Sequence, residues 1–159
     1  MRPVVAALWA MFGVVAPYDI HQASPAPQHA SAPAVLLDEA RTVKINIRLD
    51  DRIIPATLNA SKAAQDFASL LPLSLNLKDY ASTEKVSDLP RRLSTDGAPP
   101  GFDPSVGDIA YYAPWGNLAI YYRDFEYSTG LVSLGTLASG ADIFASSRSM
   151  RVTFELAPR

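Results

Sequence analysis

The chain has 159 residues, with 14 Lys and Arg against 16 Asp and Glu, so its formal charge at pH 7 is −2. This balance argues against a nucleic-acid-binding protein, because such proteins present a basic surface to the phosphates. Cysteine is absent, and the two histidines, His21 and His29, precede the first regular pattern of the chain. The folded part therefore lacks a disulfide, a Ser-His-Asp relay and a Cys-His pair. We expect neither a metal ion nor a cofactor in it.

The first 41 residues carry the features of an exported protein. Arg2 is followed by an uncharged apolar run over residues 4–16, which is shorter than the roughly 20 residues that a membrane-spanning helix needs. We predict a signal peptide over residues 1–23, with cleavage between 23 and 32, and a flexible Ala/Pro/Ser linker over 24–41. Residues 42–159 then form the mature domain, periplasmic or secreted and without a membrane span. The alternatives are an ordinary buried helix and an upstream start-site error.

The domain begins with a predicted hairpin. Residues 42–49 alternate strictly between apolar and polar side chains, which is the pattern of a half-buried strand. If Asp50 and Asp51 form a two-residue loop, three apolar pairs share one face: Ile47 with Ile54, Ile45 with Ala56, and Val43 with Leu58.

The middle of the chain predicts one helix and several strands. Residues 61–71 place Ala64, Phe67, Ala68 and Leu71 at helical spacing, after Ser61 as a cap. Strand spacing resumes at residues 73–77, and the Pro- and Gly-rich residues 94–107 read as a long surface loop. A strand over 131–137, a helical turn near 141–145 and a last strand complete the chain; the last strand is expected to point these residues inward: Val152, Phe154 and Leu156.

Residues 108–124 form the most informative segment, because two aromatic-rich runs flank a predicted four-residue loop over 114–117. This register places Tyr111 opposite Ile120 as inward partners, with Tyr112 and Tyr121 pointing outward. The full inward set is expected to be Ile109, Tyr111, Ala113, Leu118, Ile120 and Tyr122. Many short strands with few helices predict an all-β, closed antiparallel barrel with one or two short helices.

The same segment carries a family resemblance. The sequence GDIAYYAPWGNLAIYY (107–122), with KVSDLPRRLST (85–95) and LVSLG (131–135), resembles the small bacterial cyclophilin-like proteins. These are minimal eight-stranded barrels related in fold to the cyclophilin prolyl isomerases, and the resemblance covers about residues 42–156. It implies an eight-stranded cyclophilin-like barrel. The Phe-His-Arg segment of true cyclophilins is missing, so the resemblance transfers no catalytic residue.

Candidate binding residues follow from the expected fold. The interior of an eight-stranded barrel is filled by its own side chains, so a ligand must bind on the outer wall or in a cleft between loops. The candidates on that wall are Phe102, Tyr112, Trp115 and Tyr121. The alternative interpretation is that these aromatic residues only cover the sheet.

Arg91 and Arg92 are further candidates, because an isomerase needs a donor to the prolyl nitrogen and an arginine can supply it. The alternative is an ion pair with a nearby carboxylate such as Asp88 or Asp96. The acidic residues near Gly and Pro, including Asp103, are expected to form turns rather than a catalytic pair or a calcium site.

We therefore expect an exported, non-catalytic domain that binds a peptide or a small ligand on the outer barrel wall. The main alternative is a prolyl isomerase with an atypical arginine site. A third possibility is a purely structural interaction domain, which would lack an apolar cleft beside Arg91 or Arg92.

Overall fold

The computed structural model describes residues 42–146 and 148–158. The predicted signal peptide and linker, with His21 and His29, lie outside the described residues. The elements are, in chain order, β1 (Val43–Leu49), β2 (Arg52–Leu58), α2 (Lys62–Ala68), β3 (Leu73–Tyr80), β4 (Glu84–Asp88), β5 (Gly101–Phe102), β6 (Asp108–Tyr112), β7 (Asn117–Tyr121), β8 (Ser128–Thr129), β9 (Leu131–Leu137), η1 (Ala141–Phe144) and β10 (Met150–Leu156).

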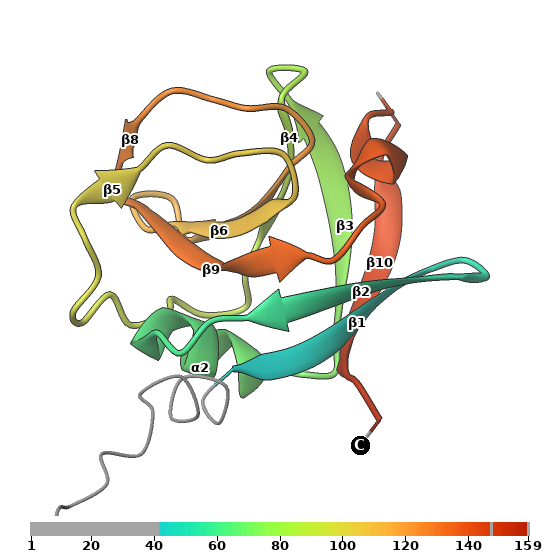
Figure 1. The fold of residues 1–159 in the computed structure, drawn as a ribbon, viewed down its shortest axis with the longest axis horizontal. Helices are drawn as coiled ribbons and strands as arrows, with labels where there is room; N and C mark the ends of the chain where they lie inside the picture. The colour runs from blue at the N-terminus through green and yellow to red at the C-terminus, as the bar shows by residue number, and fades with distance from the viewer. Residues whose placement is uncertain (1–41, 147, 159) are drawn as a thin grey trace, which may run out of the picture. The chain divides into compact units, whose positions relative to one another are not determined.

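Eight of the strands form a closed barrel in the order β1-β10-β3-β4-β7-β6-β9-β2 (Figure 1). Every pair of neighbours is antiparallel. The first and last strands of the domain pair with each other, and Arg48 on β1 binds Glu155 on β10 with an N–O distance of 2.7 Å. The predicted closed antiparallel barrel, with its one helix and short helical turn, is confirmed.

The first hairpin forms as the sequence predicts, and the helix begins at the predicted cap but ends at Ala68, three residues before its predicted end. Ile47 pairs with Ile54 across the turn, and both are buried. Ser61 caps α2, because its hydroxyl oxygen accepts a hydrogen bond from the Ala64 N–H at 3.1 Å. α2 lies against β2 and β9 (Figure 1). Its Phe67 packs edge-on against Phe154, with 5.4 Å between ring centroids.

The register of the β6–β7 hairpin differs from the prediction by two residues. Tyr111 faces Leu118 rather than Ile120, and Ile109 faces Ile120. The loop therefore spans 113–116, and it ends on Gly116, whose φ of 78° only glycine adopts without strain. Because a two-residue shift preserves the alternation of side chains, the predicted inward and outward faces are still correct.

A second difference concerns the end of the last strand. Val152 and Phe154 are buried as expected, but Leu156 is 58% exposed. β10 pairs with β3 only as far as Phe154, which faces Leu73, the first residue of β3. Leu156 lies beyond that point, so no neighbouring strand covers it on this side.

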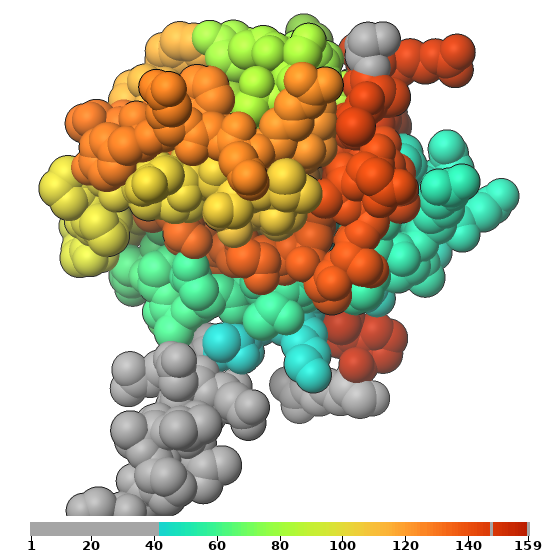
Figure 2. Space-filling model, turned by 45° about the horizontal axis from the view of Figure 1, so that its top comes forward, coloured from blue at the N-terminus to red at the C-terminus, as the bar shows by residue number. Residues whose placement is uncertain are grey.

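A short ribbon covers part of the outer wall. Within the predicted loop 94–107, β5 pairs with β8 through Gly101↔Thr129 and Phe102↔Ser128. In Figure 2, the yellow segment that contains β5 and the orange segment that contains β8 lie side by side on the surface. Outside the main core lies a second apolar cluster, with these buried members: Ala110, Ala119, Tyr121 and Leu131.

One lysine lies inside the barrel. The Lys85 side chain is fully buried, and its ammonium group donates to Asp79 Oδ1 at 3.0 Å and to the carbonyl oxygens of Ser146 and Arg148. The Tyr122 hydroxyl donates to the same Asp79 oxygen at 2.7 Å. These bonds hold the pKa of Asp79 below its usual value, Tyr122 first and Lys85 second. Burial, with the bond to Asp79, raises the pKa of Tyr122 to about 12.

Candidate functional site

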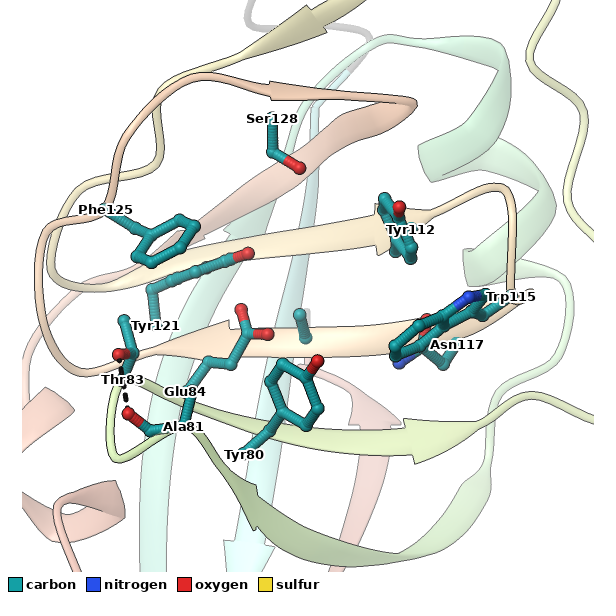
Figure 3. Close-up of a pocket in the computed structure, with 11 residues that line it drawn as sticks. Tyr80, Ala81, Thr83, Glu84, Tyr112, Trp115, Asn117, Tyr121, Phe125 and Ser128 are labelled. Carbon is teal, nitrogen blue, oxygen red and sulfur yellow. Dashed lines mark hydrogen bonds between the residues drawn. The ribbon is translucent and has the colours of Figure 1, made fainter.

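A pocket of about 230 Å³ opens on the outer face of β4, β6 and β7 (Figure 3). Three separate parts of the chain form it: the β3–β4 turn, the β6–β7 hairpin and the segment that leads into β8. The lining residues are Tyr80, Ala81, Thr83, Glu84, Tyr112, Trp115, Asn117, Ala119, Tyr121, Phe125 and Ser128.

Aromatic side chains form the walls of the pocket. Trp115, at the tip of the β6–β7 hairpin, stands edge-on to Tyr80 and Tyr112, with ring centroids 5.9 and 5.4 Å apart. Trp115 is 61% exposed and Phe125 is 49% exposed. Figure 3 shows Phe125 at the other end of the pocket, beside Tyr121. Large aromatic surfaces that stay open to solvent around a concave site are typical of ligand-binding sites.

Local backbone geometry positions these walls. Ala81 and Ser82 adopt φ values of 52° and 55°, a left-handed turn that reverses the chain between Tyr80 and Glu84. On the opposite side, the N–H of Phe125 donates to the Pro104 carbonyl oxygen at 2.9 Å, which anchors the segment before β8.

Two of the polar side chains that line the pocket, Glu84 and Asn117, carry a buried oxygen atom. Figure 3 shows the Glu84 side chain reaching from β4 between Tyr80 and Tyr121, toward the middle of the pocket. Its Oε2 atom and the Asn117 Oδ1 atom are buried, and neither has a hydrogen-bond partner in the part of the chain that the structure describes. Burial raises the pKa of Glu84, although the Tyr121 hydroxyl partly counteracts that shift. Burial, with the neighbouring Glu84, raises the pKa of Tyr121 as well.

The aromatic candidates from the sequence divide between two places. Tyr112, Trp115 and Tyr121 line this pocket, although Tyr121 is itself only 4% exposed. Phe102 lines a different hollow of about 250 Å³, beside the start of β9.

The two arginine candidates point elsewhere. Arg91 Nη2 donates to the Ser69 hydroxyl at 2.8 Å, and its guanidinium lies 3.8 Å from the Asp66 carboxylate, so it binds the end of α2. The expected ion-pair partners, Asp88 and Asp96, are not the ones that Arg91 uses. Arg92 donates to the carbonyl oxygens of Ala113 at 2.6 Å and Pro114 at 3.4 Å, and so stabilises the hairpin loop.

The lining residues that the sequence did not identify as candidates include Tyr80, Glu84, Asn117 and Phe125. They lie on β3, β4, β7 and the loop before β8, and only the closed barrel brings them together. The alternation of Glu84 with the buried Lys85 was the one local signal, because a strand there points consecutive side chains to opposite faces.

Within residues 42–146 and 148–158, no three or more His, Asp or Glu side chains gather in a way that could hold a metal ion. Across the same residues, no helix has the length and apolar character needed to cross a membrane.

The domain is a closed eight-stranded antiparallel barrel with a pocket on its outer wall. The profile of the Cyclophilin-like family matches residues 47–155, and the chain belongs to that family. The structure is also similar to the solution structure of a hypothetical protein from Archaeoglobus fulgidus, with a TM-score of 0.53 and 14% sequence identity. That similarity covers 74% of this chain and 96% of the other, and it supports the fold alone. No curated protein matches the chain.

Proposed function

We propose that the domain is a non-catalytic binding module whose outer-wall pocket holds a small ligand or one side chain of an extended peptide. The observation that carries this proposal is the aromatic pocket itself, with Trp115 and Phe125 exposed at its mouth. Its volume of about 230 Å³ is below the roughly 300 Å³ at which pockets for drug-sized ligands begin, so the bound group is small.

The placement of the arginines supports a binding role over prolyl isomerisation. An isomerase needs a donor within hydrogen-bond reach of the prolyl nitrogen, next to an apolar slot for the ring. None of the described residues that line the pocket is an arginine, a lysine or a histidine. Arg91 and Arg92 are instead bonded to α2 and to the hairpin loop.

An isomerase assay on several Xaa-Pro peptides tests the non-catalytic part of the proposal. We expect little or no turnover by the wild-type protein, and no difference in Arg91→Ala or Arg92→Ala variants. Robust turnover that either substitution abolishes would overturn the proposal in favour of an arginine-based isomerase. Turnover that both variants retain after repurification would also overturn it and would point to other residues.

Calorimetric titration with a panel of short peptides, each presenting a neutral, acidic or basic side chain, tests the binding part. We expect at least one class to bind the wild-type protein, and Trp115→Ala to abolish that binding by removing one wall of the pocket. Tyr127→Ala is the matched control, because Tyr127 is 55% exposed and does not line the pocket. Absence of binding by every class, or equal loss in both variants, would contradict a ligand site at this pocket.

We also propose that the protein is exported, on the strength of Arg2 and the apolar run over residues 4–16. N-terminal sequencing of protein from the native host should find a mature start between Ser24 and Val35. A cytoplasmic protein that still begins at Met1 would contradict export.

A further inference from the structure

The described side chains that line the outer-wall pocket carry a negative charge and no positive one. Glu84 is the only acidic side chain among its described lining residues, and no basic side chain faces it there. The carboxylate lies between Tyr80 and Tyr121 (Figure 3), where water can solvate it only in part. A negative charge in such a position attracts a cation more strongly than the same charge would on an open surface.

Two buried acceptor atoms indicate that the cation carries N–H donors. Glu84 Oε2 and Asn117 Oδ1 receive no hydrogen bond from any described residue. Buried acceptors left without a donor are costly, so a ligand whose N–H groups meet them after a turn of the two side chains toward the pocket gains more than one that has no N–H group. A quaternary ammonium ion has no N–H group and cannot satisfy either atom.

The aromatic walls of the pocket further restrict the kind of cation that fits. Tyr80, Tyr112 and Trp115 offer π surfaces within one pocket, and cations are attracted to the faces of such rings. A compact ammonium group has the N–H donors but cannot stack. A guanidinium is planar, stacks on aromatic rings and donates a fork of N–H groups to a carboxylate.

We propose that the pocket binds a guanidinium group, carried by an arginine side chain of a peptide or by a small guanidino compound. This inference rests on the proposed function, since it names the chemical class of ligand for the same site. The guanidinium pairs with Glu84 and lies against the aromatic walls. The raised pKa of Glu84 is consistent with this, because burial makes its negative charge costly and a bound cation removes that cost.

Calorimetric titration of the full chain with acetyl-arginine amide and with its citrulline counterpart tests the charge requirement. Citrulline has nearly the same shape but no charge. We expect the arginine compound to bind at least about tenfold more tightly, as the loss of a hydrogen bond to a charged group implies. Equal affinity for both compounds would overturn the proposal.

Glu84→Gln tests the partner on the protein. We expect this variant to weaken binding of acetyl-arginine amide about ten- to a hundredfold, and Glu84→Asp to recover part of the loss. Glu155→Gln is the matched control, because it removes a carboxylate that lies outside the pocket. Thermal unfolding of each variant verifies the fold, and equal weakening by Glu84→Gln and Glu155→Gln would overturn the proposal.

Three further ligands test the need for N–H donors and the source of the guanidinium group. Tetramethylammonium that binds as tightly as acetyl-arginine amide would overturn the need for N–H donors. Tighter binding of acetyl-Ala-Arg-Ala amide than of agmatine would identify a peptide as the source of the guanidinium, and the reverse would identify a small molecule. Binding of neutral or acidic peptides alone would overturn the guanidinium proposal while leaving the proposed function intact. Absence of binding by every peptide and by agmatine would overturn both proposals.

Discussion

Glu84 and Lys85 are neighbours on β4, but their side chains lie on opposite faces of the barrel wall. The two faces differ in whether the protein supplies partners for the charge. Inside the barrel, the Lys85 ammonium group has a carboxylate and two carbonyl oxygens as partners. Outside, Glu84 Oε2 is buried without a partner among the described residues. The inner charge is compensated by the protein and so contributes to the fold. The outer charge is compensated only in part, by the Tyr121 hydroxyl, and a bound cation would complete the compensation, which is the pattern expected of a functional site.

Removing the inner charge should have the largest effect on stability. Lys85→Met fits the same space but removes one of the two donors to Asp79 and the donor to two carbonyl oxygens, so we expect a loss of about 3–5 kcal/mol in the free energy of unfolding. Glu84→Gln should change it by less than about 0.5 kcal/mol, because it removes a charge that the fold does not use. Urea denaturation measures both values, and a larger loss in Glu84→Gln than in Lys85→Met would reverse the comparison.

The neighbouring hairpin should show the same contrast between the inner and outer faces. Ile120 is fully buried in the main core, whereas Tyr112 lies half-buried on the outer wall. We expect Ile120→Ala to cost about 2–5 kcal/mol and Tyr112→Ala much less. The midpoints of urea denaturation at constant slope give the difference; equal losses would mean that the two faces of the hairpin are energetically alike.

The smallest effect we predict is a difference in pH dependence. The pKa of Asp79 is lowered from 3.8, so its contribution is present above that pH and is lost as the pH falls through the lowered value. The pKa of Glu84 is raised from 4.5, so the folded state is favoured by protonation below that pH and loses this advantage as the pH rises.

Stability relative to the wild type should therefore change in opposite directions for two neutral variants. As the pH rises from about 3 to about 7, Asp79→Asn should become progressively less stable than the wild type, and Glu84→Gln progressively more stable. Denaturation midpoints across this range measure both trends. Two trends of the same sign would contradict the assignment of the inner and outer charges.

The parts of the fold that depend on local alternation could be predicted from the sequence. In residues 43–58 the two-residue turn determines the register, so the pairing of Ile47 with Ile54 could be inferred correctly. In the β6–β7 hairpin the faces were predicted but the register was wrong by two residues, because alternation is unchanged by such a shift. The need for glycine at the last loop position, Gly116, distinguishes the two registers.

The site could be predicted only in part. Tyr112, Trp115 and Tyr121 are close in sequence and stand on one predicted face, which is why they were identified as candidates. Glu84 joins them through the strand order of the barrel, and its alternation with Lys85 indicates only the face on which it lies. Phe125 joins them through a covering loop, which leaves no local pattern. The partners of Arg91 and Arg92 likewise depend on the tertiary arrangement of α2 and the hairpin loop.

The pairing of β1 with β10 has a consequence for how the barrel forms. Arg48 and Glu155, bound across this seam, are separated by 107 positions in the chain. Contacts between such distant residues close large loops, which makes folding slow compared with that of helical proteins of similar size. Until residues 150–156 are in place, both β1 and β3 present unpaired edges that can recruit strands from other molecules. The end of the domain therefore protects its beginning from aggregation.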